Sequence, residues 1–304
     1  MRVRLGKGIA LLVALAAVLV LLAARCGSRR IEASETRQPT ARARLALPGF
    51  PPTVGHVFLL VFENRGYSEI IDSSDAPYLN ELARRYELAT NYYAVTHPSL
   101  PNYLALTGGS TFGIKSNCAE CNIPGSSLAD EIEAEGLTWR AYFESLPHPC
   151  YTGARAGLYV KKHNPFIYYD AIRNDRARCR ENIVPLTELR NDLASGSLPN
   201  FALLIPNLCH DMHDCDVRAG DAWLERFLPT ILESHAYQEG GVLFLTFEED
   251  GGNDGNRVAT LVISPYARVA ARLTAPYDHY TLLRTIEDLL GLSHLRSTPP
   301  ETPA

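Results

Sequence analysis

Short apolar runs recur along this chain, and segments with helical character separate them. The run at residues 56–62 is apolar almost throughout, which is typical of a strand buried on both faces of a sheet. Further runs that predict strands lie at residues 138–143, 201–205, 241–247 and 258–264. Helices are predicted at residues 79–86, 127–135, 221–233 and 279–290. Strands that alternate with helices predict an α/β fold, a three-layer α/β/α sandwich around a mostly parallel sheet.

The length and charge of the chain limit what it can be. Its 304 residues suffice for one large domain, which we expect at residues 53–296. The net charge is -5, and the body of the chain has no tract rich in Lys and Arg, which argues against a nucleic-acid partner. Residues 27–52 are rich in Arg, Ala, Thr, Ser and Pro and predict a flexible linker, and residues 297–304 predict a disordered tail.

The N-terminus has the features of an export signal. Basic residues precede an unbroken apolar run at residues 9–24, so residues 1–26 predict a signal peptide or a short membrane anchor. The run is shorter than the roughly 20 residues that span a bilayer comfortably, which favours cleavage. Cys26 follows an arginine rather than a small residue, which disfavours lipidation. We expect an exported protein, either secreted or tethered at the outer face of the membrane.

Six cysteines follow Cys26, and an even number in an exported chain favours disulfides. Fifteen pairings are possible. A zinc knuckle is the alternative, but it needs two closely spaced Cys-x-x-Cys pairs and the chain has one. Proximity in the sequence suggests the pairs Cys118 with Cys121, Cys150 with Cys179, and Cys209 with Cys215.

Acidic residues follow two of the predicted strands. Glu63 and Asn64 come directly after residues 56–62, and Glu248, Glu249 and Asp250 come after residues 241–247. Ligands bind outside the carboxyl ends of parallel strands, where consecutive carboxylates repel one another unless a cation compensates. We therefore expect a divalent metal ion with oxygen ligands, with Ca, Mg and Zn as candidates. The alternative is that these are ordinary charges in solvated turns.

Ser99 is the candidate nucleophile. It lies between Pro98 and Pro101, ahead of a short apolar helix predicted at residues 103–107 and closed by two glycines. A serine there can cap the helix, where backbone N–H groups and the positive helix end favour an anion. The alternative role is that of a helix cap and nothing more.

A second polar cluster follows residues 201–205. Within the segment 206–215, His210 and His213 alternate with aspartates inside a predicted disulfide loop. These histidines and aspartates could complete a second metal site, and the histidines could bind phosphate or protonate a leaving group. The alternative is a surface loop pinned by its disulfide.

Several separated motifs resemble one known family. Ser99-Leu100-Pro101-Asn102 resembles the nucleophile loop of the alkaline phosphatase superfamily. More closely, His97-Pro98-Ser99-x-Pro101-Asn102-Tyr103 resembles the bacterial phosphoesterase family of acid phosphatases and phospholipases C. The resemblance runs from about His56 to Leu292. It implies an alkaline-phosphatase-like fold, with a metal held by Glu63, Asn64, Ser99, Glu248 and Glu249.

The family's metal motif is matched by Thr246-Phe247-Glu248-Glu249, with Glu where the family usually has Asp, so the choice of ligands among Glu248, Glu249 and Asp250 stays open. Lys162-His163-Asn164-Pro165-Phe166 resembles a His-Asn-Pro motif that could offer His163 to a phosphate oxygen. His97 and His279 are further candidates for substrate binding, although His279 could equally be a ligand or a surface residue. His148 is assigned to a loop.

The resemblance implies an exported, metal-dependent phosphatase of phosphate monoesters, with lipid phosphates such as phosphoinositides among its possible substrates. Ser99 would attack phosphorus, Asn102 and the helix start would stabilise the developing charge, and water would hydrolyse the phosphoserine. His210 or His213 would protonate the leaving alcohol. The alternatives are a phosphodiesterase of the phospholipase C type and an inactive, surface-tethered binding module. A sulfatase is disfavoured because position 102 is Asn rather than Arg.

Overall fold

The computed structural model describes residues 45–295. The predicted signal or anchor, Cys26, most of the predicted linker and the predicted tail lie outside these residues. Within them, an eight-stranded sheet has the order β11-β2-β10-β9-β1-β8-β4-β7. Its strands are β1 (Val57–Phe62), β2 (Glu87–Ala89), β4 (Trp139–Phe143), β7 (Ile183–Pro185), β8 (Phe201–Ile205), β9 (Val242–Phe247), β10 (Thr260–Ile263) and β11 (Arg272–Leu273).

The sheet is mostly parallel, as predicted. β1 pairs in parallel with β8 on one side and with β9 on the other, and β4 pairs in parallel with β8 and β7. β10 runs antiparallel to both β9 and β2. The connection from β9 to β10 contains no helix, so the chain turns back beside the strand it has just left instead of crossing over.

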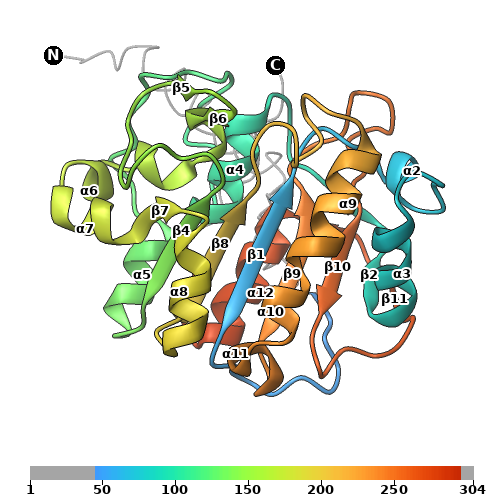
Figure 1. Ribbon diagram of the computed structural model, residues 1–304. Helices are drawn as coiled ribbons and strands as arrows, with labels where there is room; N and C mark the ends of the chain where they lie inside the picture. The colour runs from blue at the N-terminus through green and yellow to red at the C-terminus, as the bar shows by residue number, and fades with distance from the viewer. Residues whose placement is uncertain (1–44, 296–304) are drawn as a thin grey trace, which may run out of the picture. The chain divides into compact units, whose positions relative to one another are not determined.

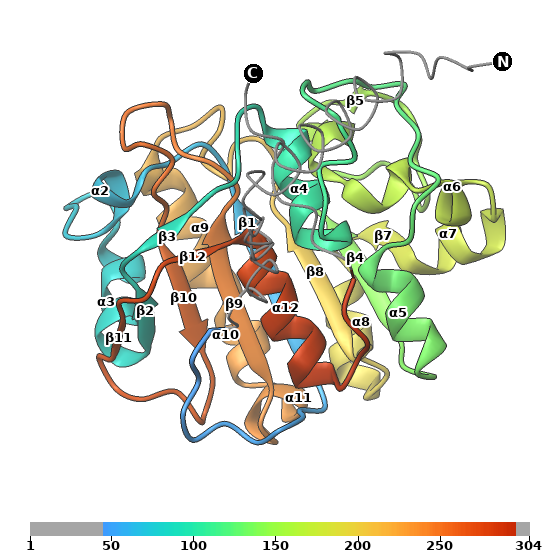
Figure 2. The same cartoon turned by 180° about the vertical axis from the view of Figure 1, so that it is seen from behind.

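Helices cover both faces of the sheet. Figure 1 shows α8 and α9 in front of the sheet, and Figure 2, from behind, shows α4, α5 and α12 on the opposite face. Every residue of β1, β8 and β9 is buried between these layers, which confirms the three-layer architecture. The helices are α2 (Tyr67–Ile70), α3 (Pro77–Arg85), α4 (Ser99–Gly108), α5 (Leu128–Ala134), α6 (Asp170–Arg173), α7 (Arg176–Asn182), α8 (Glu188–Ser195), α9 (Val217–Phe227), α10 (Pro229–Leu232), α11 (His235–Gln238) and α12 (His279–Leu290).

Short elements at the carboxyl edge of the sheet were not predicted. The hairpin at residues 155–160 lies beside the segment that follows β8, because Leu208 N–H in that segment donates to the Leu158 carbonyl in the hairpin at 3.1 Å. These elements are the two-stranded pairs β5 (Arg155–Ala156) with β6 (Tyr159–Val160) and β3 (Tyr92–Tyr93) with β12 (Tyr277–Asp278), and the 3₁₀ helices η1 (Lys161–His163) and η2 (Pro165–Tyr168).

The helix predicted at residues 221–233 is shifted and divided. Asp216 caps α9 by accepting a hydrogen bond from Ala219 N–H, and Pro229 separates α9 from α10. Asp221, the predicted first residue of this helix, lies inside α9. Its carboxylate accepts hydrogen bonds from the first turn of α3, at 2.8 Å from Leu79 N. Asp221 therefore links α9 to α3 and does not form the start of a helix.

The predicted linker ends earlier than residue 52. Leu45 is buried, and its N–H donates to Thr285 Oγ1 at 2.8 Å. Phe50 packs edge-on against Tyr266 with ring centroids 5.7 Å apart. Apolar side chains at these positions pack the described part of the predicted linker, residues 45–52, against the domain.

The described residues contain three disulfides, and all three predicted pairs are confirmed. They join Cys118 to Cys121, Cys150 to Cys179, and Cys209 to Cys215. Between Leu45 and Leu295, the helices are too short or too polar to cross a bilayer.

Candidate active site

Ser99 is the first residue of α4, and its hydroxyl is free of helix capping. Pro98 occupies the N-cap position, and the side chain that caps the first turn is Asn117, whose Oδ1 accepts from Leu100 N–H at 2.9 Å, so the prediction that Ser99 caps the helix is wrong. The helix also begins four residues earlier than predicted and includes Pro101. A proline is tolerated there because N–H groups in the first turn have no acceptor within the helix. The Ser99 hydroxyl consequently lies at the positive end of a buried helix.

Two carboxylates from neighbouring strands approach the Ser99 hydroxyl. Its Oγ lies 3.4 Å from Glu63 Oε2 and 3.4 Å from Glu249 Oε1. Glu63 follows β1 and Glu249 lies just beyond β9, so the adjacent parallel strands bring them to one edge of the sheet. Both side chains are almost completely buried. The sequence-predicted nucleophile and acidic residues are therefore brought together.

The buried carboxylates crowd one another. Burial, followed by the charge of Glu63, raises the pKa of Glu249 to about 8. Burial, Glu63 and Glu249 raise the pKa of Glu248 well above its ordinary value. Burial alone would also raise the pKa of Glu63, but His163 and Lys162 outweigh it and lower that pKa to about 2.

The Glu248 carboxylate binds the backbone of Asn64. Glu248 Oε2 accepts hydrogen bonds from Asn64 N–H at 3.0 Å and from Glu249 N–H at 2.6 Å. Asn64 has a φ of 51°, a left-handed conformation that asparagine tolerates, and its side-chain Nδ2 lies 3.4 Å from Glu63 Oε2. These hydrogen bonds hold Asn64 beside Glu63 and Glu248.

The donor set fits a divalent cation. Glu248 Oε1 is fully buried and has no hydrogen-bond partner, which is costly for a carboxylate oxygen unless a cation binds it. Asp250 is different, because its carboxylate accepts hydrogen bonds from Gly252 N–H at 2.7 Å and from Asp254 N–H at 2.6 Å. Glu248 Oε1 is thus the buried oxygen of these carboxylates that has no partner among the described residues, because Glu249 accepts from Ser99 Oγ through Oε1 and from Asn102 Nδ2 through Oε2. Across residues 45–295, no three His, Cys, Asp or Glu side chains already form a metal cage.

The Asn102 side chain binds the loop before α4 and one of the acidic side chains. Its Oδ1 accepts hydrogen bonds from Val95 N–H at 3.0 Å and from Thr96 N–H at 3.1 Å. Its Nδ2 donates to the Thr96 carbonyl at 2.7 Å and to Glu249 Oε2 at 3.2 Å. Asn102 therefore fixes the strand-to-helix loop and one carboxylate around Ser99.

His163 is buried between two acidic side chains. Its Nε2 lies 3.0 Å from Glu63 Oε1, and its Nδ1 lies 3.3 Å from Asp211 Oδ2. Burial would lower the pKa of His163, but Glu63 and Asp211 raise it above its ordinary value. Its ring also stacks on Tyr103, whose hydroxyl donates to Glu63 Oε1 at 2.7 Å. His163 and Tyr103 thus orient Glu63.

His213 belongs to a hydrogen-bonded chain that ends at Ser99. Its Nδ1 lies 2.7 Å from Asp214 Oδ1, and its Nε2 lies 3.2 Å from Lys162 Nζ. Lys162 Nζ in turn lies 3.3 Å from Ser99 Oγ. Because an ammonium only donates, Nε2 of His213 accepts and its Nδ1–H donates to Asp214.

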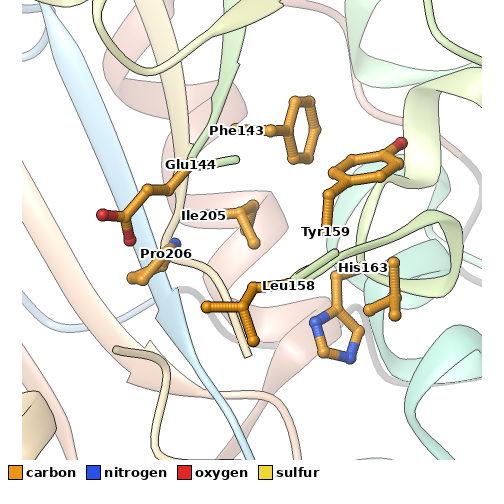
Figure 3. A pocket seen from close by; sticks show the side chains of 8 residues that line it. Phe143, Glu144, Leu158, Tyr159, His163, Ile205 and Pro206 are labelled. Carbon is orange, nitrogen blue, oxygen red and sulfur yellow. The ribbon is translucent and has the colours of Figure 1, made fainter. Parts of the chain in front are cut away.

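His210 is held by a carboxylate and an aromatic ring. Its Nδ1 lies 2.8 Å from an oxygen of Glu144, the residue after β4, and its ring stacks on Trp223. Figure 3 shows Glu144 and His163 beside a cavity of about 10 Å³, which holds at most one water molecule. The other lining residues are Phe143, Leu158, Tyr159, Val160, Ile205 and Pro206.

The remaining two candidate histidines, His97 and His279, occupy different environments. His97 is about half exposed, with Nδ1 2.9 Å from Glu249 Oε2, so it lies at the rim of the site. His279 is fully buried, and its Nε2–H donates to the Glu248 carbonyl at 2.6 Å while its Nδ1 accepts from the Tyr92 hydroxyl at 2.9 Å. Burial lowers the pKa of His279 to about 4. With both nitrogens occupied, His279 supports Glu248 from behind instead of contacting substrate or metal.

Sequence reasoning assigned no role to Lys162 or Tyr103, and considered Asp211 only as part of a possible second metal site. All three lie within motifs that were recognised for other residues: Lys162 precedes His163, Asp211 lies between the two loop histidines, and Tyr103 ends the nucleophile motif. The signal that the sequence offered for a role of these three residues was their position inside recognised motifs. Their contacts depend on residues distant in the sequence, which no local pattern reveals.

Comparison with known proteins agrees with this geometry. An α/β/α sandwich that gathers a serine hydroxyl and buried carboxylates at the carboxyl ends of its strands has groups suited to the hydrolysis of phosphoric esters. The Phosphoesterase family matches residues 68–293, and the chain belongs to this family. It is accordingly an enzyme that hydrolyses phosphoric ester bonds.

Individual relatives show how far the similarity extends. A phosphatidylinositol-3-phosphatase of Mycobacterium tuberculosis is 33% identical over 257 residues, which cover 83% of each chain. An acid phosphatase of Aspergillus fumigatus is 32% identical over 75% of this chain, which spans only 54% of that enzyme. An alkaline phosphatase superfamily protein of Vibrio parahaemolyticus shares the fold with a TM-score of 0.60 and 16% identity, over 86% of this chain and 72% of that one.

Proposed function

We propose that this chain is an exported, metal-dependent phosphatase that hydrolyses phosphate monoesters through a phosphoserine at Ser99. One observation carries the proposal: the Ser99 hydroxyl lies at the start of a buried helix, within 3.4 Å of carboxylates from two neighbouring strands. A serine with only a structural role needs no such acidic surroundings.

The metal ligands in this proposal are Glu63, Asn64, Ser99, Glu248 and Glu249. The unpaired buried Oε1 of Glu248 supports a cation at this position. Such a cation, for which Ca, Mg and Zn are candidates, would promote ionisation of the serine hydroxyl and neutralise phosphate oxygens. His279, Tyr103 and His163 then orient the ligands.

The chain's own residues carry the chemistry as follows. Ser99 Oγ forms a bond to phosphorus as the bond from phosphorus to the ester oxygen breaks. The start of α4 favours the negative phosphoryl group. Of the two candidates for proton exchange with the leaving alcohol and the attacking water, His213 is the stronger, because Lys162 links its Nε2 to the Ser99 hydroxyl, whereas His210 binds Glu144. His97, at the rim, is placed to contact the rest of the substrate.

The relatives indicate the substrate class. The M. tuberculosis relative acts on a phosphoinositide by its name, and the fungal relatives are acid phosphatases. We therefore propose small phosphate monoesters, including lipid phosphates, as substrates. The three disulfides support export to an oxidising compartment, where the N-terminal segment would act as a signal or a tether.

The test compares p-nitrophenyl phosphate with bis(p-nitrophenyl) phosphate, with and without chelator. We expect monoester hydrolysis that chelator abolishes and added metal restores, a radiolabelled phosphoenzyme after an acid quench, and loss of both activity and label in Ser99→Ala. Ser74→Ala, at an exposed position after α2, is the matched control and should retain activity.

Each contrary result has a definite meaning. Preference for the diester would favour a phosphodiesterase of the phospholipase C type. A folded, metal-loaded protein that cleaves neither ester would favour the binding module. Full activity in Ser99→Ala would refute the assignment of the nucleophile.

A further inference from the structure

We propose that Lys162 binds an oxygen of the transferring phosphoryl group and so selects phosphate monoesters over diesters. The inference rests on the proposed phosphatase function and adds the residue that determines this specificity. Lys162 moves no proton in this role. It contributes a fixed positive charge beside the nucleophile.

The position of Lys162 is set by its neighbours in the chain. Lys161 and His163, on either side of it in η1, are both buried. The Lys161 ammonium donates to the Ala119 carbonyl, and Asn164 N–H donates to the Lys161 carbonyl at 2.8 Å, which closes the turn. The backbone that carries Lys162 is thus anchored on both sides, and its half-buried side chain extends to Ser99.

The contacts of the Lys162 ammonium are unusual for a lysine. Its hydrogen-bond acceptors among the described residues are Ser99 Oγ at 3.3 Å and His213 Nε2 at 3.2 Å, both neutral. No carboxylate lies within ion-pair distance of it in this part of the chain. An ammonium has three N–H donors, so two short contacts leave one donor available to a ligand.

The site otherwise presents negative charge to an anionic substrate. The other side chains that contact Ser99 Oγ are Glu63 and Glu249. A phosphoryl group bonded to Ser99 carries its remaining oxygens around Oγ, so a donor 3.3 Å from Oγ is within reach of one of them. Lys162 therefore meets the oxygens on which charge accumulates during transfer.

This placement favours monoesters for an electrostatic reason. A phosphate monoester has a charge of about -1.5 to -2 at neutral pH, whereas a diester has a single charge because its second substituent blocks one oxygen. A fixed cation beside the nucleophile therefore stabilises a bound monoester more than a diester. Loss of the cation should reduce monoester hydrolysis selectively.

The experiment measures kcat/KM for p-nitrophenyl phosphate and for bis(p-nitrophenyl) phosphate in the metal-loaded enzyme, together with inhibition by inorganic phosphate. The variants are Lys162→Gln and Lys162→Arg. Arg190→Gln, which removes a positive charge from the exposed surface of α8, is the matched control.

We expect Lys162→Gln to lose about 100-fold in monoester kcat/KM and less than about tenfold for the diester, as for removal of one donor to a transition-state oxyanion. The inhibition constant for phosphate should rise by a similar factor, and Lys162→Arg should recover part of both. Arg190→Gln should match the parent.

Three outcomes would overturn the inference. Equal losses for both esters, or an unchanged phosphate inhibition constant, would mean that Lys162 acts structurally. Retention of full monoester activity in Lys162→Gln, with an unchanged unfolding midpoint, would remove it from the site altogether. Absence of hydrolysis by the parent enzyme would instead refute the proposed function, so the two failures are distinguishable.

Discussion

Glu287 should make the stability of this protein depend on pH near neutrality. Its side chain lies in α12 with only 1% of its surface exposed, and its Oε1 accepts a hydrogen bond from Leu295 N–H at 2.9 Å. Burial, opposed by that hydrogen bond and by Arg284, raises the pKa of Glu287 from 4.5 to about 7, with small further increases from Asp288 and Glu131.

The direction and size of the effect follow from this pKa. Between pH 4.5 and pH 7, the folded state holds a proton that the unfolded state has released, so stability falls as the pH rises. Below this window the side chain is protonated in both states, and above it the loss is constant. At about 1.36 kcal/mol for each pKa unit, the total loss is about 3 kcal/mol at most.

Glu287→Gln removes the charge and keeps the oxygen that accepts from Leu295. We expect it to exceed the parent in free energy of unfolding by up to about 3 kcal/mol at pH 8, and to differ little at pH 4.5. Urea unfolding, followed by fluorescence at pH values from 4.5 to 8.5 in metal-free buffer, measures this difference. Glu225→Gln, at an exposed position on α9, is the control. A difference that does not change with pH, or a variant less stable than the parent at pH 8, would refute the reasoning.

Two further predictions concern residues that orient the acidic ligands. Tyr103→Phe removes the hydrogen bond to Glu63 and should cost about 2 kcal/mol in urea unfolding and lower kcat; unchanged values for both would show that the hydroxyl is dispensable. His279→Phe keeps a ring but leaves the Tyr92 hydroxyl and the Glu248 carbonyl unpaired, so it should destabilise the fold by about 2–4 kcal/mol and weaken reactivation of the chelated enzyme by metal. Reactivation at the parental metal concentration would contradict the proposed support of Glu248.

The local pattern of the sequence predicted the central elements well, for a physical reason. β8 and α12 match their predicted bounds, and β1 and β9 differ by one residue at their starts. These elements are buried, so their apolar periodicity records their secondary structure directly. Short strands such as β2 and β11 have few residues, and tertiary pairing rather than composition decides their conformation.

The start of α4 shows where local rules were insufficient. Two prolines around Ser99 suggested a loop, but a proline in the first turn of a helix removes no intrahelical hydrogen bond. The helix start therefore depended on how this segment packs against α12 and the 3₁₀ helices η1 and η2. The prediction that Asn102 stabilises the developing charge did not include its hydrogen bonds with the nearby backbone of Val95 and Thr96 and with the distant Glu249.

The sequence by itself determined the α/β architecture, the disulfide pairs suggested by proximity, and the membership of Ser99, Glu63 and Glu249 in one family pattern. These depend on periodicity and on residues close together in the chain. Only the tertiary structure decided that Asp250 is tied up by its own turn, that His279 lies behind the site, and that Lys162 reaches Ser99. Each of these outcomes is set by which hydrogen-bonding atoms are already satisfied. For His279 and Lys162 that depends on contacts between segments far apart in the sequence, and for Asp250 on the geometry of its own turn.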